Sequence, residues 1–150
     1  MPEATYVMSL PYPPEVVFAF VADAENNPRW HEHVNETRWI DPPPTDVGRR
    51  GRQTGHLFGR GWAFVAKVAE YDPPRRVVFQ VIEGYRVRTA IDVEPDGAGG
   101  TRLRTVVTTP RMPGPLDGLA SRLLLRSTAS RARGDLARLM AALQAVSERP

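Results

Sequence analysis

The C-terminal third of the chain carries its strongest pattern of apolar positions. From Leu125 to Val146 the apolar residues recur at alternating steps of four and three. This spacing puts them on one stripe of a helix. An earlier apolar patch, Leu116 to Leu123, lies on roughly the opposite side of the same helix from this stripe, given a helical rotation of about 100° per residue. The pattern predicts a long helix over Leu116–Val146 with two apolar faces, each of which another part of the fold must cover.

The first thirty residues predict one strand followed by two short helices. Thr5–Leu10 alternates between apolar and polar positions, which is typical of a strand. Glu15–Ala22 is apolar nearly all round, so we expect a largely covered helix that begins near Pro14. Asp23–Trp30 indicates a break and then a second short helix.

From Val34 to Thr109 the pattern changes to strands separated by tight turns. The strands expected here are Val34–Ile40, Gly48–Phe58, Trp62–Tyr71, Val77–Ile82, Tyr85–Glu94 and Thr101–Thr109. A run of strands without intervening helices favours an antiparallel sheet in an α+β domain. We therefore predict a curved antiparallel sheet of about seven strands, wrapped around the long C-terminal helix.

The last two of these strands have the clearest register. A turn centred on Ala98 pairs Glu94 with Arg102 and Asp92 with Arg104 across the hairpin. These charged residues indicate a solvated outer face of the sheet.

The opposite face of this hairpin carries three hydroxyl groups among apolar side chains. They belong to Tyr85, Thr89 and Thr105. Sparse polar groups of this kind orient ligands in apolar pockets. The alternative is that each hydroxyl bonds only to neighbouring backbone or to water.

Composition limits the class of protein without choosing a function. The 150 residues fit one domain, 1–150, with one sizeable core. The chain has no cysteine, which excludes disulfides and thiolate chemistry. The longest apolar run, Val16–Ala22, is too short to span a bilayer, and the first residues lack the pattern of a signal peptide. We therefore expect a cytoplasmic protein with no integral membrane segment.

A net charge of +3 raises the question of a nucleic-acid partner. Acidic residues are interspersed with the arginines, and no dense basic run interleaved with aromatic residues occurs. We expect no nucleic-acid partner on this ground. The sequence leaves open whether the protein is a monomer or a homodimer.

Four motifs along the chain resemble those of one known superfamily. They are Pro14–Phe18 with Asp23 and Trp30, Val68–Arg76, Gly99–Arg102 and Pro113–Leu116. In this order they resemble the START-related SRPBCC superfamily, specifically its polyketide cyclase/dehydrase and lipid-transport branch. The resemblance implies a helix-grip fold, in which a curved antiparallel sheet grips the C-terminal helix around an apolar tunnel. It also implies binding of a hydrophobic molecule such as a lipid, sterol or polyketide, which a minority of members also transform.

A histidine-rich stretch, His31-x-His33 with Glu32 and Glu36, is the first place to test for a metal site. Two histidines two apart on a strand could share a face, and a carboxylate could complete the site. The order differs from the helical H-E-x-x-H arrangement, in which the ligands sit one turn apart. The stretch also follows a helix end directly and is expected to be exposed. We therefore expect no metal and no other cofactor.

The position of His56 depends on the register of one hairpin. If that hairpin is centred on Arg60, His56 shares a face with Phe58, Trp62 and Phe64. This apolar company indicates the cavity side of the sheet, where a histidine could hydrogen-bond a ligand or be satisfied by a neighbour in the core. A two-residue turn would shift the register and reverse the face.

Together these observations predict binding or transport of a hydrophobic small molecule between the sheet and the C-terminal helix. The predicted ligand-binding residues are Trp39, His56, Phe58, Trp62, Phe64, Tyr85, Thr89, Thr105, Leu116, Leu119 and Leu123. One alternative is a polyketide cyclase, aromatase or dehydratase with His56 and Tyr85 as the candidate acid and base. A second is a protein-interaction module that uses the basic sheet face. Within the helix, we expect Leu136–Val146 to be permanent core and the earlier patch to face the tunnel mouth.

Overall fold

The computed structural model describes residues 3–57, 59–110 and 134–148 of the chain. The strands are β1 (Glu3–Leu10), β2 (Val34–Trp39), β3 (Arg50–Leu57), β4 (Arg60–Asp72), β5 (Arg76–Glu83), β6 (Arg88–Pro95) and β7 (Thr101–Thr108). The helices are α1 (Pro14–Val21), the 3-10 turn η1 (Ala24–Asn26), α2 (Asn27–Trp30) and a C-terminal helix over 134–147. The predicted apolar patch at 116–123 lies outside the described residues.

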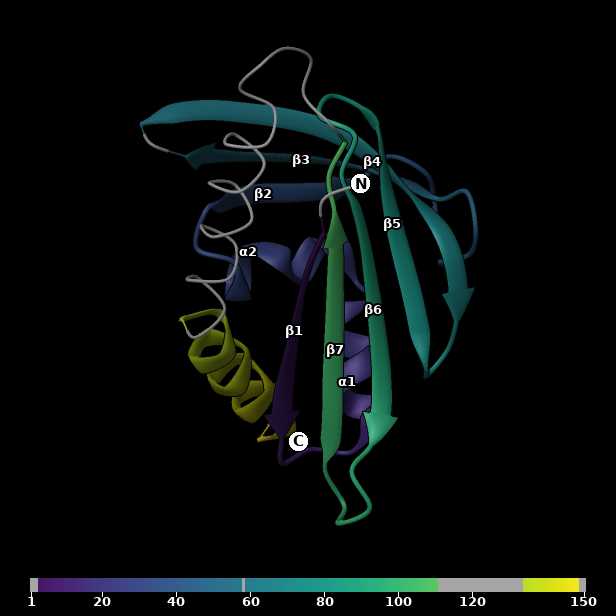
Figure 1. Ribbon diagram of the computed structural model, residues 1–150, viewed down its shortest axis with the longest axis vertical. Helices are drawn as coiled ribbons and strands as arrows, with labels where there is room; N and C mark the ends of the chain where they lie inside the picture. Colours follow the sequence, from purple (N-terminus) through teal and green to yellow (C-terminus); the bar gives the residue numbers. More distant parts are fainter. Residues whose placement is uncertain (1–2, 58, 111–133, 149–150) are drawn as a thin grey trace.

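The seven described strands form one antiparallel sheet in the order β1-β7-β6-β5-β4-β3-β2. Five of the six neighbouring pairs are consecutive in sequence, and β1 joins the sheet by pairing with β7. Figure 1 shows how strongly the sheet curls, because β2, β3 and β4 run across the direction of β1, β7 and β6. Register shifts in the β2–β3 and β4–β5 pairs add local bends of the kind that curvature needs.

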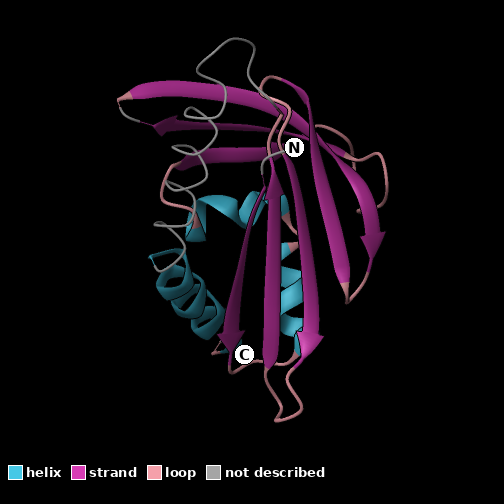
Figure 2. Ribbon diagram, in the orientation of Figure 1, coloured by secondary structure: helices cyan, strands magenta, loops and turns pink. Residues whose placement is uncertain are grey.

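The helices follow from the local sequence and cover one side of the curled sheet. Figure 2 shows α1 and α2 on that side and the C-terminal helix beside β1. Helix α1 has a proline in its first turn, followed by Glu15, and it buries Val17, Phe18, Phe20 and Val21. A missing N–H costs nothing at that position, and a carboxylate there faces the positive end of the helix dipole.

The described part of the C-terminal helix belongs to the core, as its apolar spacing predicts. Leu139 and Leu143 are fully buried in the same cluster as Met8, Val17 and Trp30. Leu136 and Val146 pack against that cluster from the same stripe. Burial of a leucine side chain stabilises a fold by about 1.5–3 kcal/mol, so this stripe anchors the helix to the rest of the chain.

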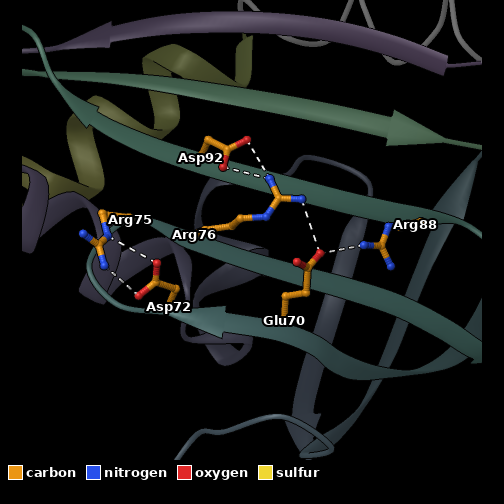
Figure 3. A network of polar contacts seen from close by, with 6 residues as sticks. All are labelled: Glu70, Asp72, Arg75, Arg76, Arg88 and Asp92. Atoms are coloured by element: carbon orange, nitrogen blue, oxygen red, sulfur yellow. Dashed lines mark hydrogen bonds and ion pairs between the residues drawn. The ribbon is translucent and has the colours of Figure 1, made fainter.

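The β6–β7 hairpin has the predicted register, with Glu94 opposite Arg102 and Asp92 opposite Arg104. The ion pair that Asp92 makes is nevertheless with Arg76 on β5, at 2.8 Å. Arg76 also contacts Glu70, and Arg88 bonds the same carboxylate at 2.7 Å (Figure 3). Arg76 and Arg88, two cations on this outer face of the sheet, are therefore paired with carboxylates.

Candidate ligand-binding site

A cavity of about 280 Å³ lies between the curled sheet, α2 and the first described turn of the C-terminal helix. Its apolar wall comes from β4, β5, β6 and β7 and includes Trp62, Phe64, Phe79, Val81, Ile91 and Val107. Trp62 and Phe64 are two apart on β4 and stack with their rings nearly parallel and their centroids 5.2 Å apart. Successive inward positions of these strands thus form a continuous apolar wall.

Gly55 allows Trp62 to lie against the sheet. It sits directly opposite Trp62 in the β3–β4 pair. A Cβ at this position would overlap the Trp62 ring and the backbone oxygen of His33. Only glycine fits this close approach, so β3 contributes space rather than a side chain at this point.

The polar end of the cavity lies where α2 meets the C-terminal helix. His31 Nδ1 lies 3.0 Å from Asp135 Oδ2, and both residues line the cavity. Arg138, one turn further along the helix, bonds Asp135 at 3.3 Å and Glu32 at 3.2 Å. Asp135 is only 7% exposed, so its negative charge is balanced by partners rather than by open solvent.

The position of His31 is fixed by the short helix before it. Asn27 and Pro28 open α2, and the His31 N–H closes it by donating to the Asn27 carbonyl at 2.9 Å. The His31 ring packs on the Trp30 ring with centroids 3.7 Å apart. Because Asp135 is an acceptor, a neutral His31 donates from Nδ1 and keeps Nε2 as an acceptor.

Two buried nitrogen atoms of residues that line the cavity have no hydrogen-bond partner among the described residues. They are the indole Nε1 of Trp30, in a residue that is 1% exposed, and Nδ1 of His33. Both residues line the cavity. Buried polar groups are normally paired, so unpaired ones beside a cavity indicate where a ligand atom can bond.

Several other polar groups in the lining have partners within the described protein. Gln53 Oε1 accepts from Asn27 Nδ2 and from Thr37 Oγ1, both at 2.8 Å. Trp39 donates its indole N–H to Asp23 Oδ1 at 3.0 Å, and the Arg49 guanidinium lies 4.0 Å from the centre of its ring. These contacts hold the side chains in place as a wall.

Four of the predicted ligand-binding residues, Trp39, Trp62, Phe64 and Thr89, line the cavity. Thr105 is buried, but it is outside the lining, and its hydroxyl has no partner within the described part of the chain. The predicted residues Phe58, Leu116, Leu119 and Leu123 lie outside the described residues.

His56 lies outside the cavity lining, because the expected hairpin register was wrong. Leu57 pairs with Arg60, so the turn has two residues and is not centred on Arg60. His56 therefore alternates with Gly55 onto the outer face, where it is exposed and bonds Asn35 Oδ1 at 2.7 Å. The second alternative that the sequence left open, a reversed face, is the observed one.

Tyr85 is also outside the lining and is 38% exposed. It was expected inside a strand, but β5 extends to Glu83 and β6 begins only at Arg88. Tyr85 thus lies in the connection, where strand alternation does not apply, and its hydroxyl donates to the Pro110 carbonyl at 3.3 Å.

The sequence did carry a signal for one residue that was missed. Asp135 stands four residues before Leu139 and eight before Leu143, on the buried stripe of the helix. An acidic residue in phase with buried leucines indicates a paired or functional carboxylate. Its partner His31 was considered only for metal binding, and the described residues contain no group of three side chains arranged to hold a metal ion.

Comparison with protein families adds an independent observation to this geometry. The family model described as "Polyketide cyclase / dehydrase and lipid transport" matches residues 1–148. The chain belongs to this family. Within the described residues of this family member, no helix is long and apolar enough to cross a membrane.

Solved structures show the same fold at low sequence identity. TTHA0849 from Thermus thermophilus has a TM-score of 0.82 and 21% identity, with 98% of this chain and 100% of that chain covered. The Zhui aromatase/cyclase from Streptomyces sp. R1128 has a TM-score of 0.78 and 13% identity, with coverage of 95% and 93%. A START superfamily protein from Mycobacterium smegmatis has a TM-score of 0.75 and 12% identity, with coverage of 96% and 98%. Comparison with curated protein sequences gave no match.

These likenesses show that this member of the polyketide cyclase/dehydrase and lipid transport family has the START-related helix-grip fold. The predicted fold class and superfamily are confirmed. At such identities the structures show the fold alone, so the activity must be argued from this chain's own residues.

Proposed function

We propose that the protein binds a hydrophobic small molecule, lipid- or polyketide-like, in the cavity between the sheet and the C-terminal helix. The observation that carries the proposal is the cavity of about 280 Å³ with its continuous aromatic and aliphatic wall. Membership of the polyketide cyclase/dehydrase and lipid transport family supports it. Apolar surfaces of this kind release about 2.5 kcal/mol for each ~100 Å² that a ligand buries, before the cost of ordering the ligand.

The size of the cavity suggests the scale of the ligand. Pockets for drug-sized molecules are typically about 300–1,000 Å³, and this one lies at the lower limit. A compact molecule of two or three fused rings, or a short folded chain, suits that volume. The stacked pair Trp62 and Phe64 offers a flat wall against which a planar ring packs well.

Native mass spectrometry of the purified protein, with solvent extraction of whatever it carries, tests the binding function. The matched titration uses naphthalene as a probe in the wild type, in Trp62→Ala and in His56→Ala. We expect Trp62→Ala to weaken binding about tenfold through lost apolar contact, and His56→Ala to change it less than about twofold. A protein that carries no hydrophobic molecule and binds no probe contradicts the proposal.

A second candidate function is a cyclase, aromatase or dehydratase reaction on a polyketide-like chain. The observation that favours it is the bonded pair of His31 and Asp135 in the cavity lining. In that role His31 Nε2 would accept or return a proton, and Asp135 would hold the ring in one orientation. His56 and Tyr85 are not in the lining, so His31 takes their place in this hypothesis.

Binding and catalysis separate in the variant His31→Gln. If the protein is an enzyme, His31→Gln should lose turnover of a synthetic poly-β-ketone and keep its affinity for that compound. If the protein is a carrier, neither the wild type nor His31→Gln should show turnover, and only the affinity should change. Binding without any turnover by the wild type on such compounds leaves the carrier function in place and removes the enzyme function.

A further inference from the structure

The indole N–H of Trp30 is a donor that the described protein residues leave unused. Trp30 lines the cavity, is 1% exposed, and its Nε1 has no hydrogen-bond partner among those residues. The other tryptophan with a described indole bond, Trp39, donates to Asp23. An indole nitrogen can only donate, so the group that satisfies Trp30 must be an acceptor atom. Leaving a buried donor without one is costly, which favours a ligand that supplies an oxygen at this point.

The charges around the same end of the cavity limit what kind of oxygen fits. Among the described lining residues the only acidic or basic side chains, apart from the histidines, are Glu32 and Asp135. Arg138 bonds both carboxylates and is not itself in the lining. These residues thus offer an anionic ligand no unpaired arginine or lysine, and burial of its charge would add a desolvation cost. A neutral oxygen avoids that cost.

Three other polar side chains of the lining already have partners. Asn27 and Thr37 already donate to Gln53, and His31 is held by Asp135. His33 contributes a second buried nitrogen without a described partner, Nδ1, in the same lining. The unpaired Nε1 of Trp30, whose ring packs on His31, therefore marks the His31–Asp135 end of the cavity as the place for a ligand's polar group.

We propose that the ligand is a neutral, carbonyl-bearing apolar molecule whose oxygen accepts a hydrogen bond from Trp30 Nε1. The inference rests on the proposed binding function and narrows its ligand class. Ketones, esters and aldehydes with an aromatic or aliphatic body fit it, and no unpaired arginine or lysine among the described lining residues favours a fatty-acid carboxylate or a phosphate ester. The carbonyl end lies at Trp30, and the apolar body packs against Trp62 and Phe64.

Isothermal titration with two isosteric probes tests this hydrogen bond. The probes are 2-acetylnaphthalene and 2-isopropenylnaphthalene, which differ in having a carbonyl oxygen or a CH₂ group at the same place. They are compared in the wild type and in Trp30→Phe, which removes the N–H and keeps an aromatic ring. We expect the substitution to weaken ketone binding roughly three- to tenfold more than hydrocarbon binding. An equal effect on both probes overturns the inference.

Trp39→Phe is the matched control, because it removes an indole N–H from the same lining that is already bonded within the protein. We expect it to change the affinities of both probes by the same factor. A ketone-selective loss in this variant, equal to that in Trp30→Phe, contradicts the assignment to Trp30.

A third probe, 2-naphthoate, tests whether the cavity accepts a negatively charged ligand. It should bind at least about tenfold more weakly than the ketone, and equal binding overturns the neutral ligand class.

The wild type supplies a second readout if Trp30→Phe does not fold. The chain has three tryptophans, so its ¹⁵N–¹H spectrum contains three indole signals, and Trp39→Phe and Trp62→Phe assign them by elimination. The Trp30 signal should move downfield on addition of the ketone and not of the hydrocarbon. The same shift with both probes contradicts the hydrogen bond. If neither probe binds the wild type at all, it is the proposed binding function that fails.

Discussion

His31 Nδ1 lies 3.0 Å from Asp135 Oδ2, and this contact joins residues that are 104 positions apart in the chain. It ties the end of α2 to the first described turn of the C-terminal helix. Both residues line the cavity, so the contact also fixes the width of the cavity's polar end. The two elements are held together by this contact and by the neighbouring pair of Arg138 with Glu32.

Replacing Asp135 should therefore destabilise the protein. Asp135→Ala removes the acceptor for both His31 and Arg138 in a position that is 7% exposed. Loss of such a buried partner costs about 1–3 kcal/mol in the free energy of unfolding, which urea denaturation measures. Glu32→Ala is the control, since its side chain is 55% exposed and a surface pair contributes about 0–1 kcal/mol. Equal losses in the two variants would show that Asp135 acts only as a surface charge.

Gly55→Ala should displace Trp62 from its position in the cavity wall. The added Cβ overlaps the Trp62 ring and the backbone oxygen of His33, so both must move. We expect a loss of about 1–3 kcal/mol in stability and weaker binding of naphthalene. Gly61→Ala on the same hairpin is the control, because its nearest neighbouring atom lies at an ordinary 3.8 Å. A Gly55→Ala protein as stable as Gly61→Ala would mean that Trp62 does not lie on the glycine.

Sequence patterns predicted one hairpin and failed on another for a physical reason. In the β6–β7 hairpin the charges of Asp92 and Arg104 and the alternation of both strands agree on a single register. In the β3–β4 hairpin the glycines at 59 and 61 permit more than one turn centre. A turn centred on Arg60 would pair Phe64 with His56, whereas the observed partner of Phe64 is Gln53, three residues away. A slip by an odd number of residues moves every side chain to the other face, which is why His56 was expected on the cavity side.

The candidate site was predictable only in its apolar half. Trp62, Phe64 and Thr89 lie in regular strands, where period-two alternation gives the inward face. The polar half combines His31, in an irregular connection, with Asp135 on a distant helix. No local pattern brings these two together, since their proximity depends on how the C-terminal helix packs on the rest of the fold.

The turn between β6 and β7 should make stability depend on acid pH through Asp96. The Ala98 and Gly100 N–H groups donate to Asp96 Oδ1 at 2.7 and 2.9 Å and hold the pKa of that carboxyl below its usual 3.8. Because the pKa is lower in the folded state, this contribution is complete above pH 3.8. It is lost as the pH falls through the folded value.

NMR titration of the Asp96 carboxyl carbon checks this directly, and a midpoint at or above 3.8 contradicts it. Asp96→Asn keeps an acceptor oxygen but cannot titrate. Its urea midpoint should therefore fall less steeply than that of the wild type below pH 3.8, and Asp96→Ala should lose the turn's stability at every pH.

The ion pairs on the outer face of the sheet should contribute unequally to the free energy of unfolding, according to their geometry. Arg76 donates to both Asp92 oxygens, at 2.8 and 2.9 Å, and reaches Glu70 as well. Among the described residues the Arg75 side chain bonds only Asp72, in a pair that is 73% and 58% exposed (Figure 3). Arg76→Met keeps most of the aliphatic stem and removes the guanidinium that joins β4, β5 and β6. We expect it to lower the free energy of unfolding by about 1 kcal/mol, and Arg75→Met by less than about 0.3 kcal/mol.

The difference should shrink in 1 M salt, because these charges are partly exposed and therefore screened. Equal effects of the two substitutions at low salt would mean that the bridging position of Arg76 between three strands adds nothing to an ordinary surface pair.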